Sequence, residues 1–171
     1  WRNLKLEVSN KVLIPRPETE LIIEIISERF QNKETKITFV DLGTGSGAIS
    51  IALALANPNW NGIATDIDKN AIEIASKNFI NNSNQTNLKF INGNWWRPLK
   101  KFKGKIDLAV ANPPYIPKDT YKSLPKEVKD YEPKIALLGG EDGLDHIKEI
   151  VKYAPFYLKE KGLLLIENHF D

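Results

Sequence analysis

The sequence contains no cysteine and no methionine, and only two of its 171 residues are histidines. The lack of cysteine excludes disulfides, thiolate nucleophiles and thiolate-bound metals. His146 and His169 have no cluster of ligating side chains around them, so we expect no metal site. No apolar run reaches the ~20 residues that a membrane-spanning helix needs, and no signal-peptide pattern opens the chain. We therefore expect a cytoplasmic protein without a membrane partner.

Charged residues are abundant but balanced, with 24 lysines and arginines against 22 aspartates and glutamates. This balance argues against a protein that holds nucleic acid through a basic surface, so we expect no direct nucleic-acid binding. The basic run at residues 100–105 is interpreted as a solvated turn. The length suits one domain with a full hydrophobic core. Because the chain begins at Trp1, we expect it to be part of a longer protein.

Short apolar runs alternate with amphipathic segments along the chain, which is typical of an α/β fold with a parallel sheet. Strands are expected at residues 37–40, 62–65, 88–91, 106–111 and 162–166. Helices are expected at residues 18–30, 48–56, 71–79 and 143–159. The pattern divides the chain into a lead-in segment with one helix, residues 1–34, and a single α/β domain, residues 35–171. Ligands of such sheets bind beyond the carboxyl ends of the strands.

Directly after the first expected strand comes a glycine-rich loop, Asp41-Leu42-Gly43-Thr44-Gly45-Ser46-Gly47. Glycines allow the backbone to approach a ligand closely, and the following helix start offers unpaired N–H groups. The second expected strand ends at Asp66, whose carboxylate could accept hydrogen bonds from ribose hydroxyls. Nicotinamide dinucleotides and S-adenosylmethionine both contain that ribose. The loop and Asp66 therefore predict an adenosine-type cofactor without deciding between the two.

The third expected strand ends in Asn94-Trp95-Trp96. Both tryptophans could cap the hydrophobic core. Alternatively, one indole covers the face of an adenine ring, and Trp95 is the better candidate because it comes first after the strand. Asn94 could then form a hydrogen bond with the exocyclic amine of adenine.

The fourth expected strand ends in Asn112-Pro113-Pro114-Tyr115. The two prolines fix the backbone and leave its carbonyl oxygens as free acceptors. The side-chain oxygen of Asn112 and the carbonyl of Pro113 could hold both hydrogens of a planar –NH2 group, against which Tyr115 would pack. Two such acceptors would localise the nitrogen lone pair and stabilise the positive charge that develops during methyl transfer. A dinucleotide dehydrogenase has no use for this arrangement, so the pattern favours methylation of nitrogen.

Two further segments restrict the choice among families of nitrogen methyltransferases. Leu13-Ile14-Pro15-Arg16-Pro17-Glu18-Thr19-Glu20 precedes the glycine-rich loop, and Tyr131-Glu132-Pro133, Ala136-Leu137 and Gly139-Gly140-Glu141-Asp142-Gly143-Leu144 follow the Asn112 segment. Together with the strand-end motifs, this set resembles the release-factor glutamine methyltransferases over nearly the full chain. The Pro15–Pro17 segment resembles a strip that passes near cofactor and target, although it could simply be a rigid lead into the next helix.

The resemblance implies methylation, by S-adenosylmethionine, of N5 of the glutamine in the Gly-Gly-Gln loop of peptide chain release factors. It also implies a Rossmann-like parallel sheet of the class I S-adenosylmethionine-dependent methyltransferase fold. The implied cofactor-binding residues are Gly43, Thr44, Gly45, Ser46, Gly47, Asp66, Asn94, Trp95 and Asn112. The implied substrate-binding residues are Asn112, Pro113, Pro114 and Tyr115, of which Asn112, Pro113 and Tyr115 are also the expected catalytic residues.

The chain departs from this family in three places. The family often has an acidic residue where Asn94 stands, so one carboxylate contact to the cofactor is expected to be missing. The family also has a small helical domain ahead of this core, which we do not expect within residues 1–171. The seven-stranded fold would continue beyond Asp171, so we expect the domain to be truncated after the fifth strand, with that strand on an open sheet edge.

Three alternatives remain. A ribosomal-protein glutamine methyltransferase would share the Asn112 segment but tends to carry a different sequence at residues 16–20. A DNA adenine methyltransferase must flip its base and grip the phosphate backbone, for which the chain has no dedicated segment. A non-catalytic module could keep the cofactor fold alone. We find no firm role for Glu167, His146 or His169 in the sequence.

Overall fold

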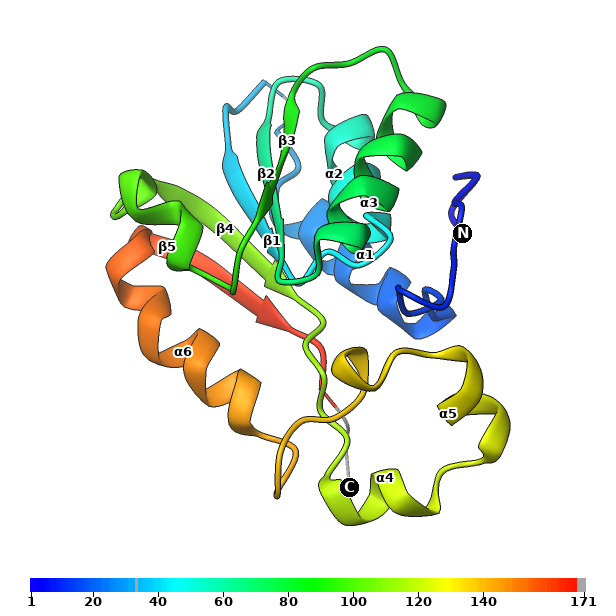
Figure 1. Ribbon diagram of the computed structural model, residues 1–171. Helices are drawn as coiled ribbons and strands as arrows, with labels where there is room; N and C mark the ends of the chain where they lie inside the picture. The colour runs from blue at the N-terminus through cyan, green and yellow to red at the C-terminus, as the bar shows by residue number, and fades with distance from the viewer. Residues whose placement is uncertain (33, 169–171) are drawn as a thin grey trace.

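The computed structural model describes residues 1–32 and 34–168, and its centre is an all-parallel sheet (Figure 1). The strands are β1 (Thr38–Leu42), β2 (Asn61–Asp66), β3 (Leu88–Asn92), β4 (Ile106–Ala111) and β5 (Leu158–Ile166). Their order across the sheet is β3-β2-β1-β4-β5. Each expected strand overlaps one of these, so the predicted α/β class and the parallel sheet are confirmed.

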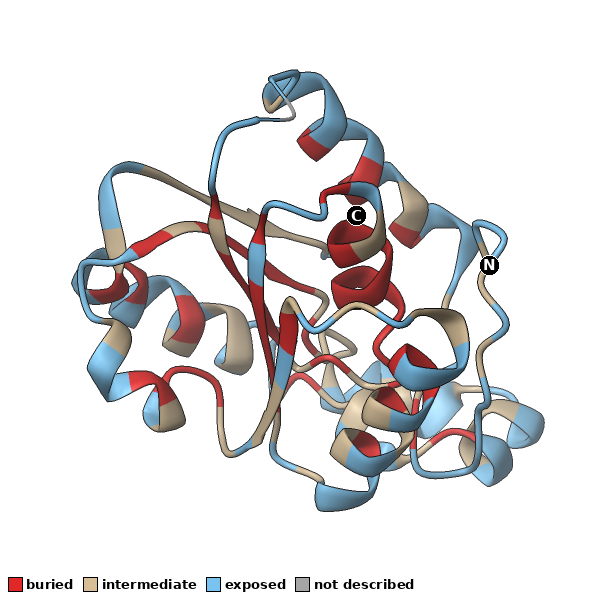
Figure 2. Ribbon diagram, turned by 90° about the horizontal axis from the view of Figure 1, so that it is seen from above, coloured by how far each residue is buried: buried red, intermediate tan, exposed pale blue. Residues whose placement is uncertain are grey.

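Helices cover both faces of the sheet, as the sequence predicts (Figure 1). One face carries α1 (Glu20–Arg29), α2 (Ala48–Ala56) and α3 (Lys69–Asn82), and the other carries α6 (Asp145–Tyr157) with the 3-10 helix η2 (Arg97–Phe102). Neighbouring strand residues pack to opposite sides: Phe39 contacts the α1–α2–α3 layer, and Val40 contacts the α6 layer. In Figure 2 the buried residues therefore lie mainly in the strands of the sheet and in α2.

Strand β5 lies at one edge of the sheet and pairs with β4. It begins four residues earlier than expected, because Leu158 pairs with Ile106 before the register shifts to Leu163 beside Leu108. Lys161 has a φ of 64° within this irregular stretch. The predicted edge position of the Leu163–Ile166 run is confirmed.

The segment between β4 and α6 contains elements that the sequence analysis did not predict: α4 (Lys118–Ser123), α5 (Lys126–Tyr131) and the 3-10 helix η3 (Lys134–Ala136). They lie beyond the carboxyl ends of β4 and β5 in Figure 1. Helices this short show no detectable hydrophobic period. The expected helix at 18–30 was also wrong at its start, since Pro17–Thr19 forms a 3-10 turn, η1, before α1.

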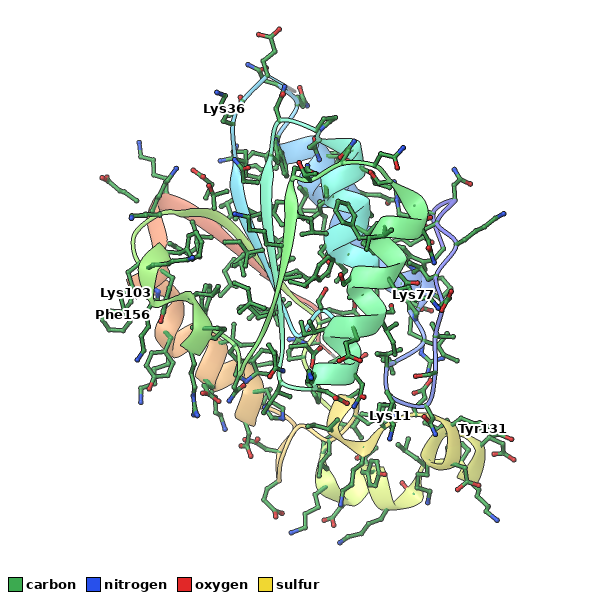
Figure 3. All side chains as sticks on the ribbon, turned by 45° about the horizontal axis from the view of Figure 1, so that its top comes forward. Lys11, Lys36, Lys77, Lys103, Tyr131 and Phe156 are labelled. Atoms are coloured by element: carbon green, nitrogen blue, oxygen red, sulfur yellow. The ribbon has the colours of Figure 1, made fainter. Side chains whose placement is uncertain are left out.

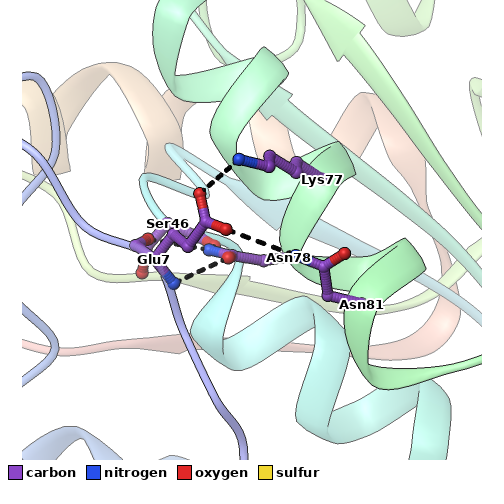
Figure 4. A network of polar contacts seen from close by, with 5 residues as sticks. All are labelled: Glu7, Ser46, Lys77, Asn78 and Asn81. Carbon is purple, nitrogen blue, oxygen red and sulfur yellow. Dashed lines mark hydrogen bonds and ion pairs between the residues drawn. The ribbon is translucent and has the colours of Figure 1, made fainter.

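The segment preceding α1 is fastened to α3 by Asn78, whose side chain is fully buried (Figure 4). Asn78 Oδ1 accepts a hydrogen bond from Glu7 N at 2.8 Å, and Asn78 Nδ2 donates to Glu7 O at 3.0 Å. The same Nδ2 donates to Ser46 O in the glycine-rich loop at 2.9 Å. Lys77 adds an ion pair with Glu7 at 2.6 Å. One buried amide thus joins the N-terminal segment, α3 and the loop.

Beyond Glu7, the chain continues past the lower ends of α1 and α3, where Lys11 lies on the same side of the molecule as Tyr131 at the end of α5 (Figure 3). No helix within residues 1–32 and 34–168 has the length and apolar character needed to cross a membrane.

Candidate functional site

The carboxyl ends of β1 to β4 meet at a cleft of about 210 Å³. This is the place where open α/β sheets bind ligands. Most of the predicted site residues line it: Gly43, Thr44, Gly45, Ser46, Asp66, Asn94, Trp95, Asn112 and Pro114. Gly47, Pro113 and Tyr115 do not line it. Gly47 instead begins α2 and packs against Ile51 and Ala75, so its position serves the contact between α2 and α3.

Hydrogen bonds fix the glycine-rich loop against the end of β2. Gly43 N and Thr44 N both donate to Thr65 O, at 2.8 and 2.9 Å. Gly45 N donates to Asp66 Oδ2 at 2.9 Å, and Asp66 Oδ1 accepts from Asp68 N at the same distance. Burial raises the pKa of Asp66, while the hydrogen bonds from Asp68 and Gly45 lower it. Each carboxylate oxygen has a second lone pair, so Asp66 can still accept from a ligand hydroxyl.

Asp41 lies beneath this loop with 1% of its surface exposed. Its Oδ2 accepts hydrogen bonds from Thr44 Oγ1 at 2.6 Å and from Ser50 N at 3.2 Å. Burial raises the pKa of Asp41 to about 6, because these hydrogen bonds offset only part of the desolvation. Among the described residues, Asp41 Oδ1 has no hydrogen-bond partner. The carboxylate therefore holds the loop from inside the protein and does not face the cleft.

The two adjacent tryptophans have different surroundings. Trp96 is a core residue: its Nε1 donates to Ile150 O at 3.0 Å, and its ring stacks on Tyr157 with centroids 4.8 Å apart. Trp95 lines the cleft, has a φ of 44° and lies 5.6 Å from the His146 ring. A positive φ is unfavourable for a bulky residue and is found where a site needs a particular side-chain direction. Trp96 therefore belongs to the core and Trp95 to the cleft, which is the arrangement that the predicted contact of Trp95 with adenine requires.

The Asn112-Pro113-Pro114-Tyr115 segment leaves the end of β4 at the cleft. Asn112 Nδ2 donates to Thr19 Oγ1 at 3.2 Å, which leaves Asn112 Oδ1 as the acceptor end of the amide. Pro113 is buried, and Pro114 lines the cleft. Burial raises the pKa of the half-buried Tyr115; the charge of Glu167 raises it further and that of Arg16 lowers it.

The glycine-containing segment at residues 139–143 packs against the backbone that follows Asn112. Gly139 N donates to Ile116 O at 2.8 Å. A side chain at Gly143, whose φ is +80°, would place its Cβ 2.3 Å from Tyr115 O. Only glycine permits so close an approach of two backbones. The segment that the sequence analysis used only as a family signature therefore holds the backbone that presents Tyr115.

Several cleft residues were missed by the sequence analysis: Lys11, Leu13, Thr19, Ile67, His146 and Glu149. Pro15 also lines the cleft, so the Pro15–Pro17 segment passes beside the site. Arg16 pairs with Glu132, which has 6% of its surface exposed, and this ion pair joins the N-terminal segment to the end of α5. His169 lies outside the described residues, and in the described part of the chain no three metal-ligating side chains gather.

Comparisons with known proteins agree with this geometry. The chain is 43% identical to the release factor glutamine methyltransferase of Prochlorococcus marinus, covering 100% of this chain and 59% of the relative. It is 41% identical to that of Synechocystis sp., covering 98% and 57%. The chain thus spans less than two thirds of the length of these curated relatives.

A solved structure, the ribosomal protein L11 methylase from Lactobacillus delbrueckii subsp. bulgaricus, has the same fold with a TM-score of 0.61. The two chains are 19% identical, and the match covers 89% of this chain and 62% of that one. The profile of the family described as "Methyltransferase small domain" matches residues 17–126. This match covers more than half of the chain, including β1 to β4 and the glycine-rich loop, and the chain therefore belongs to the methyltransferase small domain family.

Proposed function

We propose that the complete protein transfers a methyl group from S-adenosylmethionine to the N5 amide nitrogen of the glutamine in the Gly-Gly-Gln loop of peptide chain release factors. The observation that carries the proposal is that the glycine-rich loop, Asp66, Asn112 and Pro114 line the same cleft. The name shared by the curated relatives supports the choice of substrate.

The cleft residues fit an adenosine-type cofactor. Asp66 keeps acceptor capacity for ribose hydroxyls beside Gly45. Trp95 and Ile67 offer an aromatic and an aliphatic surface for the adenine ring, and Asn94 lines the cleft beside Trp95. A Cβ built on Gly45 has no neighbour within 4 Å, so the loop leaves open space on the ligand side. S-Adenosylmethionine, when bound, supplies an electrophilic methyl group.

The Asn112 segment provides the acceptors for the target amide. Asn112 Oδ1 and the carbonyl oxygen of Pro113 accept the two hydrogens of the glutamine –NH2 group in this proposal. These contacts strengthen as positive charge develops on the nitrogen, so they stabilise the transition state more than the ground state. Tyr115 packs against the planar amide and limits its rotation. Positioning provides much of the rate in such an in-line transfer.

Incubation of the complete protein with radiolabelled S-adenosylmethionine and a purified release factor tests this function. We expect label on the factor, no label when the loop glutamine is replaced, and a loss of at least a hundredfold in Asn112→Ala. Asn84→Ala removes the same side chain from an exposed position outside the cleft and serves as the matched control. Label on ribosomal protein or DNA instead of the factor would overturn the substrate assignment. Cofactor binding without any transfer would identify a binding module.

A further inference from the structure

The side-chain amide of Asn112 is held by two side chains from distant parts of the chain. Asn112 Nδ2 donates to Thr19 Oγ1 at 3.2 Å, across a separation of 93 residues. The carboxylate of Glu167 lies beside the same two side chains: burial raises its pKa, and the hydrogen-bonding groups of Thr19 and Asn112 lower it. Thr19 is 3% exposed and Glu167 is half-buried. The three side chains form one polar cluster at the carboxyl end of β4.

Regular backbone contacts place both partners of Asn112. Ile166, the last residue of β5, pairs with Ala111, and Glu167 N donates to Ala111 O at 3.0 Å. Thr19 ends the η1 turn, directly before α1. Glu167 Oε2 is buried and has no hydrogen-bond partner among the described residues. An incompletely paired buried carboxylate costs stability, so packing alone does not account for a glutamate here.

The chemistry of this cluster permits one orientation of the Asn112 amide. An ionised carboxylate accepts hydrogen bonds and cannot donate them, whereas an amide has a donor end and an acceptor end. If the amide turned over, Oδ1 would face the Glu167 carboxylate and the –NH2 group would face the cleft. That orientation brings two acceptors together and presents a donor to the target nitrogen.

We propose that Glu167 and Thr19 are positioning residues that lock the Asn112 amide with Oδ1 toward the cleft, as the acceptor that the target –NH2 group requires. This inference rests on the methyl transfer proposed above. In this role Glu167 and Thr19 act through Asn112, although Thr19 also lines the cleft. The N-terminal segment, which Asn78 fastens to α3 at Glu7, leads to Thr19 and so to this cluster.

Glu167→Gln in the complete protein tests the lock, because glutamine has nearly the same shape but can donate as well as accept. We expect kcat for release-factor methylation to fall about tenfold or more, with the Kd for S-adenosylmethionine unchanged. Glu160→Gln makes the same change at an exposed position on β5 and is the matched control. Thr19→Val should lower kcat similarly, and Thr19→Ser, which keeps the hydroxyl, should restore it. An unchanged kcat in Glu167→Gln would overturn the proposal.

A second background separates positioning from a structural defect. In Asn112→Asp both oxygens are acceptors, so orientation no longer matters and the new carboxylate is repelled by Glu167. Adding Glu167→Gln to Asn112→Asp should therefore raise kcat severalfold, the opposite of its effect beside Asn112. A glutamate needed only for folding would give a loss in both backgrounds, and that result would refute the lock.

A measurement without catalysis keeps this inference distinct from the proposed function. In protein labelled with 15N-asparagine, the signals of the Asn112 amide can be assigned by their loss in Asn112→Ala. We expect slow exchange of these protons with solvent, and exchange at least tenfold faster in Glu167→Gln. Equal exchange rates would refute the lock even if methylation is observed. Protected amide protons without methylation of any release factor would refute the proposed function and leave the lock in place.

Discussion

Replacing Gly43 by alanine should disturb the cleft through one identified contact. Gly43 has a φ of +77°, and an added Cβ would lie 2.8 Å from Cζ3 and 3.2 Å from Cη2 of Trp95. The left-handed backbone costs a residue with a side chain about 1–2 kcal/mol. Displacing a packed side chain adds about 1–3 kcal/mol. Because Trp95 lines the cleft, the indole would have to move into the space proposed for adenine.

Gly45→Ala is the matched control for this substitution. Gly45 has a φ of +56° in the same loop, but an added Cβ meets nothing within 4 Å. In the protein without cofactor it should therefore show only the backbone cost of about 1–2 kcal/mol. Urea unfolding without S-adenosylmethionine would be measured for both variants. We expect Gly43→Ala to lose about 1–3 kcal/mol more of the unfolding free energy than Gly45→Ala. Equal losses in the two variants would show that the contact with Trp95 has no such role.

Three further predictions concern Asp41, the two tryptophans and the Arg16–Glu132 ion pair. Because the pKa of Asp41 is raised from 3.8 to about 6 by folding, the folded protein holds a proton that the unfolded chain releases, and stability falls as pH rises between these values. Urea unfolding at pH 4 and pH 7 should show a fall of about 2 kcal/mol in the wild type relative to Asp41→Asn, and parallel pH profiles would contradict it. Trp96→Phe should lower the unfolding free energy by about 1–3 kcal/mol, because the indole hydrogen bond and part of the stacking are lost. Trp95→Phe should mainly weaken cofactor binding. The reverse pattern would refute the assignment of Trp96 to the core and Trp95 to the cofactor site. Arg16→Gln leaves the buried Glu132 without its cation and should lower the unfolding free energy by about 1–2 kcal/mol, a modest loss because the arginine is itself half-exposed. Adding Glu132→Gln should recover part of this loss. No recovery would argue against a stabilising ion pair.

Much of the site could be predicted because parallel strands bring their carboxyl ends to one edge of the sheet. This rule alone places Asp66, Trp95 and Asn112 around a common cleft, and the structure agrees. Gly47 was expected beside the cofactor as well, but it does not line the cleft, and an added Cβ there would meet Ile51 and Ala75 on α2 and α3. A run of glycines in sequence does not tell which ones face the ligand and which ones pack between helices.

The parts that the sequence did not predict depend on contacts across long separations. Nothing near Asn112 in the sequence indicates that Thr19 and Glu167 surround its amide, because no periodic pattern relates these positions. His146 reaches the cleft from the first turn of α6, which the sequence presents as an ordinary amphipathic helix. The short helices α4 and α5 follow prolines and are too brief for a hydrophobic period.

The most direct test of the proposed function is mass spectrometry of the release-factor peptide that contains the Gly-Gly-Gln loop, after incubation with the complete protein and S-adenosylmethionine. We expect one added methyl group on the glutamine side chain with the wild type and an unmodified peptide with Asn112→Ala. An unmodified glutamine in the presence of wild-type protein that binds the cofactor, or a methyl group on another residue of the peptide, would contradict it.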